Sequence, residues 1–170
     1  MRVAIRDAAT SKLGSASQFI EVPDLKKQRL TLSGVILENF TAAEWQKYQS
    51  GAATERTTDP MADTSLRRFK RGTVLRYGAD IYNAKLDAAR KPNLQTQIRV
   101  FRDGKMILDG KPTAFDVLPQ ADFSRLNFIG ALNLGAEMPP GEYVLQIIVT
   151  DQLAKEKRRL ATQWVQFEVL

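Results

Sequence analysis

Apolar and polar residues alternate along several segments, most clearly in residues 142–151. One face of this segment carries Tyr143, Leu145, Ile147 and Val149. A period of two with aromatic and β-branched side chains is typical of a strand that packs one face on a core. Residues 162–169 repeat the pattern with Val165, Phe167 and Val169, so the two segments are predicted to pair. The charged residues 152–161 between them are expected to form a solvated loop.

A hairpin is predicted at Asp103-Gly104, which separates two apolar stretches within residues 97–108. An Asp-Gly pair readily takes the positive φ angles that a type I′ turn requires. The expected register places Phe101 opposite Met106 and Val100 opposite Ile107.

Three further strands are predicted at residues 30–37, 73–83 and 125–134. The alternation in residues 73–83 places Leu75, Tyr77, Ala79 and Ile81 on one face. The other two segments each contain an internal glycine, Gly34 and Gly130, that is expected to mark a β-bulge.

Helical signals are few. Thr41 and Glu44 have the spacing of a capping box, which predicts a helix of two turns over residues 42–48. The following residues 50–65 contain only one sizeable apolar side chain, Met61, and are expected to form a long mobile loop. The pattern as a whole predicts an all-β sandwich with one short helix.

Composition narrows the function classes. The 170 residues include 25 Lys and Arg against 19 Asp and Glu, for a net charge of +6, and neither cysteine nor histidine. Disulfides, cysteine-zinc sites, and Ser-His or Cys-His catalysis are therefore excluded. No apolar run approaches the ~20 residues of a membrane span. We therefore expect a protein that is not an enzyme and has no cofactor.

The two ends of the chain resemble each other. Residues 2–7 match residues 146–151, since both end in apolar-x-Asp, and residues 18–22 match residues 165–169, since both end in Glu-Val. The match predicts that residues 1–22 are a two-strand hairpin remnant of a preceding β-sandwich domain. Residues 23–27 are then a linker, and residues 28–170 form the complete sandwich domain. A hairpin without its own domain is expected to self-associate through residues 1–22.

A family resemblance follows from the Pro-Gly-x-Tyr-x-Leu motif at residues 140–145 and the Val-x-Asp motif at residues 149–151. These motifs resemble a signature of immunoglobulin-like and fibronectin III-like modules, and Tyr143 matches the residue that forms a tyrosine corner in such folds. Four segments that span most of the chain, residues 14–37, 67–84, 97–105 and 139–169, resemble the C-terminal β-region of acidobacterial-type von Willebrand factor A-related proteins. The resemblance implies a bacterial, secreted or cell-envelope protein. The Asp-x-Ser-x-Ser metal motif of the A domain is absent, and Asp63-Thr64-Ser65 only echoes it.

Candidate binding residues are basic and aromatic. Arg67, Arg68, Lys70 and Arg71 begin a basic stretch that is a candidate polyanion patch. The charges alternate with apolar residues, as on the solvated face of a sandwich, and no nucleic-acid-binding motif accompanies them. Trp45 is expected to pin the helix to the sandwich, and Trp164 to pack under the long loop.

Carboxylates offer no catalytic or calcium signature. Catalytic pairs are defined by separation in space, and the chain has no clustered Asp-x-Asp spacing. Five carboxylates are expected to be surface or loop groups: Glu44, Asp80, Asp116, Asp122 and Asp151.

The function predicted from these observations is a non-catalytic structural or protein-interaction module of a larger secreted or envelope protein. Its partners would be another protein or neighbouring domains of the same chain, with no specific nucleic acid and no membrane span. The alternative is a carbohydrate- or polyanion-binding accessory module.

Overall fold

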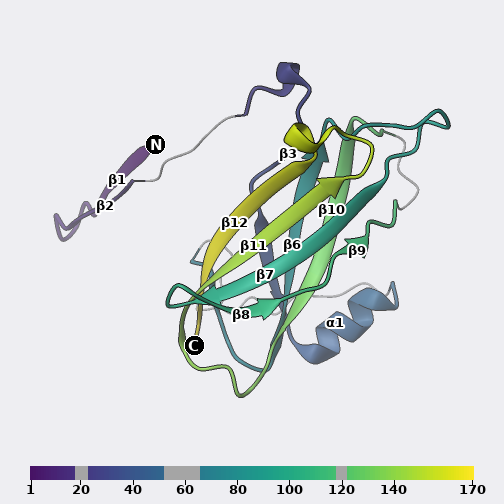
Figure 1. Ribbon diagram of the computed structural model, residues 1–170. Helices are drawn as coiled ribbons and strands as arrows, with labels where there is room; N and C mark the ends of the chain where they lie inside the picture. Colours follow the sequence, from purple (N-terminus) through teal and green to yellow (C-terminus); the bar gives the residue numbers. More distant parts are fainter. Residues whose placement is uncertain (18–22, 52–65, 118–121) are drawn as a thin grey trace.

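Two sheets, antiparallel except for one parallel edge pair in the larger sheet, pack face to face in the computed structural model, which describes residues 1–17, 23–51, 66–117 and 122–170 (Figure 1). The larger sheet has the order β5 (Arg68–Phe69), β12 (Leu160–Val169), β11 (Gly141–Asp151), β7 (Leu94–Arg102) and β8 (Lys105–Asp109), and β9 (Thr113–Ala114) also pairs with β7. The smaller sheet has the order β10 (Arg125–Leu134), β6 (Thr73–Tyr82) and β3 (Thr31–Leu32), and β4 (Ile36–Phe40) also pairs with β6. The predicted all-β sandwich is confirmed.

The core lies between the two sheets and uses the alternating residues that the pattern predicts. Both predicted faces are buried, that of β11 and that of β6. Strands β11 and β12 pair as expected, with Tyr143 opposite Phe167 and Leu145 opposite Val165. Burying one such aliphatic or aromatic side chain stabilises the fold by roughly 1.5–3 kcal/mol. The alternation therefore fixes which face of each strand points inward.

The hairpin of β7 and β8 turns at Asp103 and Gly104, whose φ angles of 50° and 72° are those the predicted turn requires. Phe101 pairs with Met106 as predicted. The predicted pairing of Val100 with Ile107 is wrong, because a register shift next to Phe101 places Val100 opposite Leu108. Ile107 is the extra residue of this bulge.

The two internal glycines differ in their roles. Across residues 33–35 the pairing with β6 shifts by one residue, since Leu32 faces Ile81 and Ile36 faces Gly78, so the chain is irregular beside Gly34 as expected. The bulge expected at Gly130 is wrong, because the β10–β6 register is continuous. A Cβ at Gly130 would lie 2.3 Å from the Tyr77 ring. Gly130 is therefore the residue that lets this ring lie on the backbone of β10.

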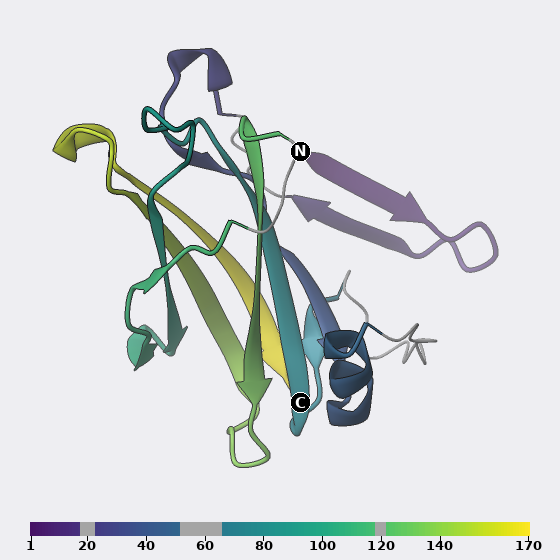
Figure 2. The same ribbon diagram turned by 90° about the vertical axis from the view of Figure 1, so that its right-hand side faces the viewer.

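Helix α1 (Ala42–Gln49) begins with the predicted capping box, in which Thr41 and Glu44 each accept a hydrogen bond from the other's backbone amide. Trp45 lies 5.7 Å from the buried ring of Phe40 and stacks on Tyr48. Arg76 of β6 covers the Tyr48 ring and pairs with Glu38. The prediction that Trp45 pins the helix is confirmed, and Figure 2 shows α1 beside one end of the smaller sheet. Of the predicted mobile loop, residues 52–65 lie outside the described residues.

An N-terminal hairpin of β1 (Arg2–Arg6) and β2 (Leu13–Ser17) forms a sheet of its own (Figures 1 and 2). Every residue of both strands is exposed. The second strand was predicted at residues 18–22, which lie outside the described residues, and the described strand comes earlier. The predicted linker contains a short 3-10 turn, η1 (Leu25–Lys27), capped by Asp24.

The ends of β1 and β11 share a local geometry. The Asp7 amide donates to Lys12 on the returning chain, and its carboxylate accepts from the amide of Ala9, two residues on. The Asp151 amide likewise donates to Arg159, and its carboxylate accepts from the amide of Leu153. When residues 2–6 are aligned with residues 146–150, the two pairing registers align residues 13–17 with residues 160–164. Pairing geometry and sequence thus give the same alignment of the two hairpins.

The last strand is closed by a parallel neighbour. Strand β5 pairs parallel with the C-terminal end of β12. The Glu168 amide donates to the Arg67 carbonyl at 2.8 Å, and the Leu170 amide donates to the Phe69 carbonyl at 2.9 Å. Phe69 is fully buried against Phe167. The chain therefore crosses from the smaller sheet, at β4, to the edge of the larger sheet, at β5.

Candidate functional site

Tyr143 lies near the start of β11 and is 1% exposed. Its hydroxyl donates a hydrogen bond of 2.6 Å to the carbonyl oxygen of Pro139, four residues upstream. Its ring stacks on Phe167, and the Arg102 guanidinium lies 5.6 Å from the ring centre. This is the geometry of a tyrosine corner, and its role is to hold the chain that enters β11.

The four residues of the candidate polyanion patch lie on and beside β5. Arg68 forms an ion pair of 2.8 Å with Glu168 of β12. Lys70 and Arg71 are exposed in the turn before β6. Further along the basic stretch, Arg76, Arg99 and Arg102 pair with Glu38, Asp109 and Asp103. Much of the positive charge is therefore balanced by adjacent carboxylates.

Four of the five carboxylates predicted to be surface or loop groups have structural partners or lie at the surface. Glu44 caps α1, and Asp80 binds Arg125 at 2.7 Å. Asp122 accepts from the Ser124 amide, and its hydrogen bonds with Ser124 lower its pKa. Asp116 is exposed. Within the described residues, no three acidic side chains lie close enough to hold a metal ion.

Asp151 differs from its prediction as a surface or loop carboxylate, because it is 0% exposed. Its two carboxylate oxygens accept hydrogen bonds from the amides of Leu153, at 2.9 Å, and Lys85, at 2.8 Å. The side chain therefore ties the turn after β11 to the loop after β6. Two backbone donors replace the water that a buried carboxylate loses.

The first candidate binding surface, here called the outer strip, crosses the outer face of the larger sheet. It takes one apolar side chain from each of four adjacent strands: Trp164, Val144, Phe101 and Met106. Phe101 pairs directly with both Val144 and Met106. Trp164 faces Gln146 and is thus diagonal to Val144, within reach for an aromatic ring.

Trp164 is 62% exposed, so the prediction that it packs under the long loop is wrong. It falls on the outward-facing positions of β12, and its neighbours Val165 and Phe167 take the core. A groove of about 440 Å³ runs beside it, lined also by Phe101, Val144 and Gln166 and by the acidic residues Asp103 and Glu142. The alternation predicts that Trp164 faces outward, but it does not predict how exposed the side chain is.

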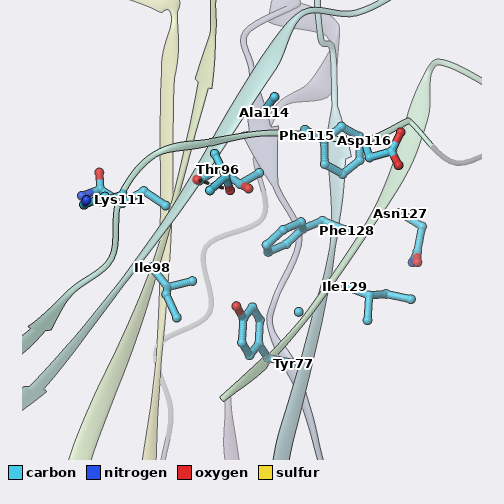
Figure 3. A pocket seen from close by; sticks show the side chains of 13 residues that line it. Tyr77, Thr96, Ile98, Lys111, Ala114, Phe115, Asp116, Asn127, Phe128 and Ile129 are labelled. Atoms are coloured by element: carbon cyan, nitrogen blue, oxygen red, sulfur yellow. Dashed lines mark hydrogen bonds between the residues drawn. The ribbon is translucent and has the colours of Figure 1, made fainter. Parts of the chain in front are cut away.

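The second candidate is the inter-sheet pocket, a hollow of about 500 Å³ at the open side of the sandwich. Figure 3 shows Thr96 and Ile98 of β7 on one side and Asn127, Phe128 and Ile129 of β10 on the other. Tyr77 of β6 forms the floor, and residues 114–116 form the roof. The pocket exists because β10 is the edge strand of the smaller sheet. The sequence does not predict this pocket, because it is defined by which strands pair and by how the two sheets pack on each other.

Strand order and the tyrosine corner together define the class of protein. One sheet joins β10, β6, β3 and β4, and the other joins β12, β11, β7 and β8. The chain crosses between the sheets to pair β5 parallel with β12. With Tyr143 in the penultimate strand, this is the arrangement of an immunoglobulin-like β-sandwich.

Comparisons with known proteins add little to this assignment. No family model matches the chain, and no curated protein matches it. Among solved structures, the chain is similar to a CARDB domain from Pyrococcus furiosus, described in complex with two metal ions, at 9% identity and a TM-score of 0.38 over 84% of this chain and 94% of that one. It is also similar to a Niemann-Pick type C2 protein from the Japanese carpenter ant, at 10% identity and a TM-score of 0.41 over 83% of this chain and 91% of that one. Scores this low support no functional argument.

Proposed function

We propose that this chain is a non-catalytic protein-interaction module that binds a partner protein through the outer strip. The observation that carries the proposal is the row of apolar side chains across four strands, with Trp164 at one end and Met106, 49% exposed, at the other. A contiguous exposed apolar patch marks an interaction surface. Placement in a secreted or envelope protein of bacteria is part of the proposal, and only the sequence resemblance supports it.

The chemistry of the groove indicates what the partner presents. Aromatic residues in a desolvated pocket are the usual centres of protein interfaces, so Trp164 and Phe101 are the expected anchors. Asp103 and Glu142 line the same groove. We infer that the partner inserts an apolar side chain flanked by a lysine or arginine.

A cross-linking experiment tests this function. A photoreactive amino acid is placed at position 164 and, as a matched control, at position 160, where Leu160 is similarly exposed on the same strand. In the native cell, a polypeptide is expected to be cross-linked from position 164 and not from position 160. The affinity of this polypeptide for the purified chain is expected to fall by about 30-fold or more in Trp164→Ala. Equal cross-linking from both positions, or unchanged affinity in Trp164→Ala, would overturn the proposal.

Carbohydrate binding is the second candidate, favoured by one observation. Trp164 has amide side chains on both sides, Gln166 on its own strand and Gln146 opposite it. An exposed aromatic face with amides beside it suits the stacking and hydrogen bonding of a sugar ring. Titration with soluble glycans distinguishes the two functions: a glycan that binds wild type but not Trp164→Ala favours this one. Polyanion binding has less support, because Arg68 is paired with Glu168.

We further propose that the N-terminal hairpin causes self-association. The exposure of Val3, Ile5 and Leu13 supports this proposal. Light scattering of the chain and of a version that starts at Asp24 tests self-association. An oligomer that becomes a monomer on truncation is expected, whereas a monomeric full chain would refute it.

A further inference from the structure

We propose that the inter-sheet pocket binds a small uncharged amphipathic molecule, with its apolar body among Ile98, Phe115 and Phe128 and an acceptor oxygen on the Tyr77 hydroxyl. The pocket lies on the opposite face of the larger sheet from the outer strip. It does not depend on the proposed protein interaction.

Tyr77 is the polar group that points to a ligand. The residue is 5% exposed, and burial raises its pKa to about 12, so its hydroxyl keeps its proton at neutral pH. Within the described residues, the structure assigns this hydroxyl no hydrogen-bond acceptor. Figure 3 shows the hydroxyl directed into the space between Ile98 and Phe128. The hydroxyl opens onto the pocket, so a ligand oxygen that accepts from it would replace a water there.

Size and lining also fit a small molecule. A volume of about 500 Å³ lies within the range of known small-molecule sites, which combine apolar walls with a few polar groups. The walls are held by packed rings, with Phe128 centred 5.9 Å from Tyr77 and 6.2 Å from Phe115. Tyr77 and Phe128 lie on the paired strands β6 and β10, and the Phe115 amide donates to the Leu94 carbonyl of β7. The pocket is therefore formed before any ligand enters.

Two glycines keep the walls in place. Gly130 allows the Tyr77 ring to lie on β10, as described above. At Gly110 a Cβ would approach the carbonyl oxygen of Ile98 to 2.9 Å, so the glycine allows this segment to cross closely over β7. Both close approaches border the pocket and hold its shape.

The rim of the pocket selects for an uncharged ligand. Lys111 and Asp116 both line it, and both are exposed. One ammonium and one carboxylate leave the mouth without net charge, and Asn127 adds an amide that donates and accepts. A charged headgroup would find one attractive and one repulsive partner at this mouth, whereas a hydroxyl or carbonyl headgroup finds hydrogen bonds.

A fluorescent probe tests the site. N-phenyl-1-naphthylamine, which is uncharged and mostly apolar, is expected to bind the full chain saturably and to be displaced by 1-decanol more effectively than by decane. Tyr77→Phe keeps the ring and removes the hydroxyl. This variant is expected to bind 1-decanol about 5- to 10-fold more weakly and to bind decane with unchanged affinity.

Two further variants locate the bound probe. Ala114→Trp places a large ring at an exposed position of the roof and is expected to abolish binding, and Leu160→Trp is the control with an added ring elsewhere. Trp164→Ala is expected to retain binding. Circular dichroism shows whether each variant is folded. The proposal is overturned if wild type shows no saturable binding, if Ala114→Trp binds like Leu160→Trp, if Trp164→Ala loses the probe, or if 1-decanol is indifferent to Tyr77→Phe.

Discussion

Replacing Tyr143 with phenylalanine removes one hydroxyl and leaves the packing of the ring in place. The hydroxyl bonds the Pro139 carbonyl at 2.6 Å within a side chain that is almost fully buried. Stacking on Phe167 and the contact with Arg102 involve only the ring, and both persist in the variant. The expected loss is therefore that of the hydrogen bond.

The magnitude follows from the burial. One such bond contributes about 0.5–1.5 kcal/mol, and the loss rises toward about 3 kcal/mol if the Pro139 carbonyl finds no water. With a urea slope of about 2 kcal/mol/M for a chain of this size, a loss of 1 kcal/mol lowers the denaturation midpoint by about 0.5 M. Tyr82→Phe is the matched control, because its hydroxyl makes only a bond of 3.4 Å to Asp80. An unchanged midpoint for Tyr143→Phe, or equal shifts in both variants, would refute the role given to the corner.

Three further predictions concern other parts of the sandwich. Asp151→Asn is expected to destabilise the chain by about 1.5–3 kcal/mol, measured by urea denaturation. One carboxylate oxygen becomes an NH2 group, which cannot accept the hydrogen bond that the Lys85 or Leu153 amide donates. Tyr77 is expected to ionise near pH 12 in an absorbance titration, and because the unfolded chain loses this proton near pH 10, stability should fall as the pH rises from about 10 to 12. The basic stretch is expected to bind heparin weakly, with elution below about 0.3 M salt and little dependence on reversing Arg68, whereas retention above that salt would favour a polyanion site.

Period-two patterns predicted the long strands and the face that each buries, since Leu75 and Leu145 are placed by alternation alone. Local turn and cap chemistry was equally informative. The Asp103-Gly104 turn and the capping box of Thr41 and Glu44 each depend only on residues that are adjacent or three apart in the sequence. These features could be predicted because their causes lie in short stretches of sequence.

Features that depend on distant neighbours could not be predicted. The bulge that pairs Val100 with Leu108 is a feature of the assembled β7–β8 pair, and the need for glycine at position 130 depends on a ring from β6. Asp151 has the sequence context of a loop carboxylate, yet the loop after β6 covers it and supplies the Lys85 amide. The inter-sheet pocket requires the edges of two sheets to be known together.

The parallel pairing of β5 with β12 has a mechanical consequence. Figure 1 shows the chain entering the sandwich near β3 at one end and leaving at the opposite end, after β12. Tension between these points acts along the strands, so the bonds from Glu168 to Arg67 and from Leu170 to Phe69 are loaded in shear and must break together. Force-induced unfolding depends on the rate of crossing such a barrier and not on equilibrium stability. A sandwich closed in this way can resist tension along its strands without opening first at its last strand.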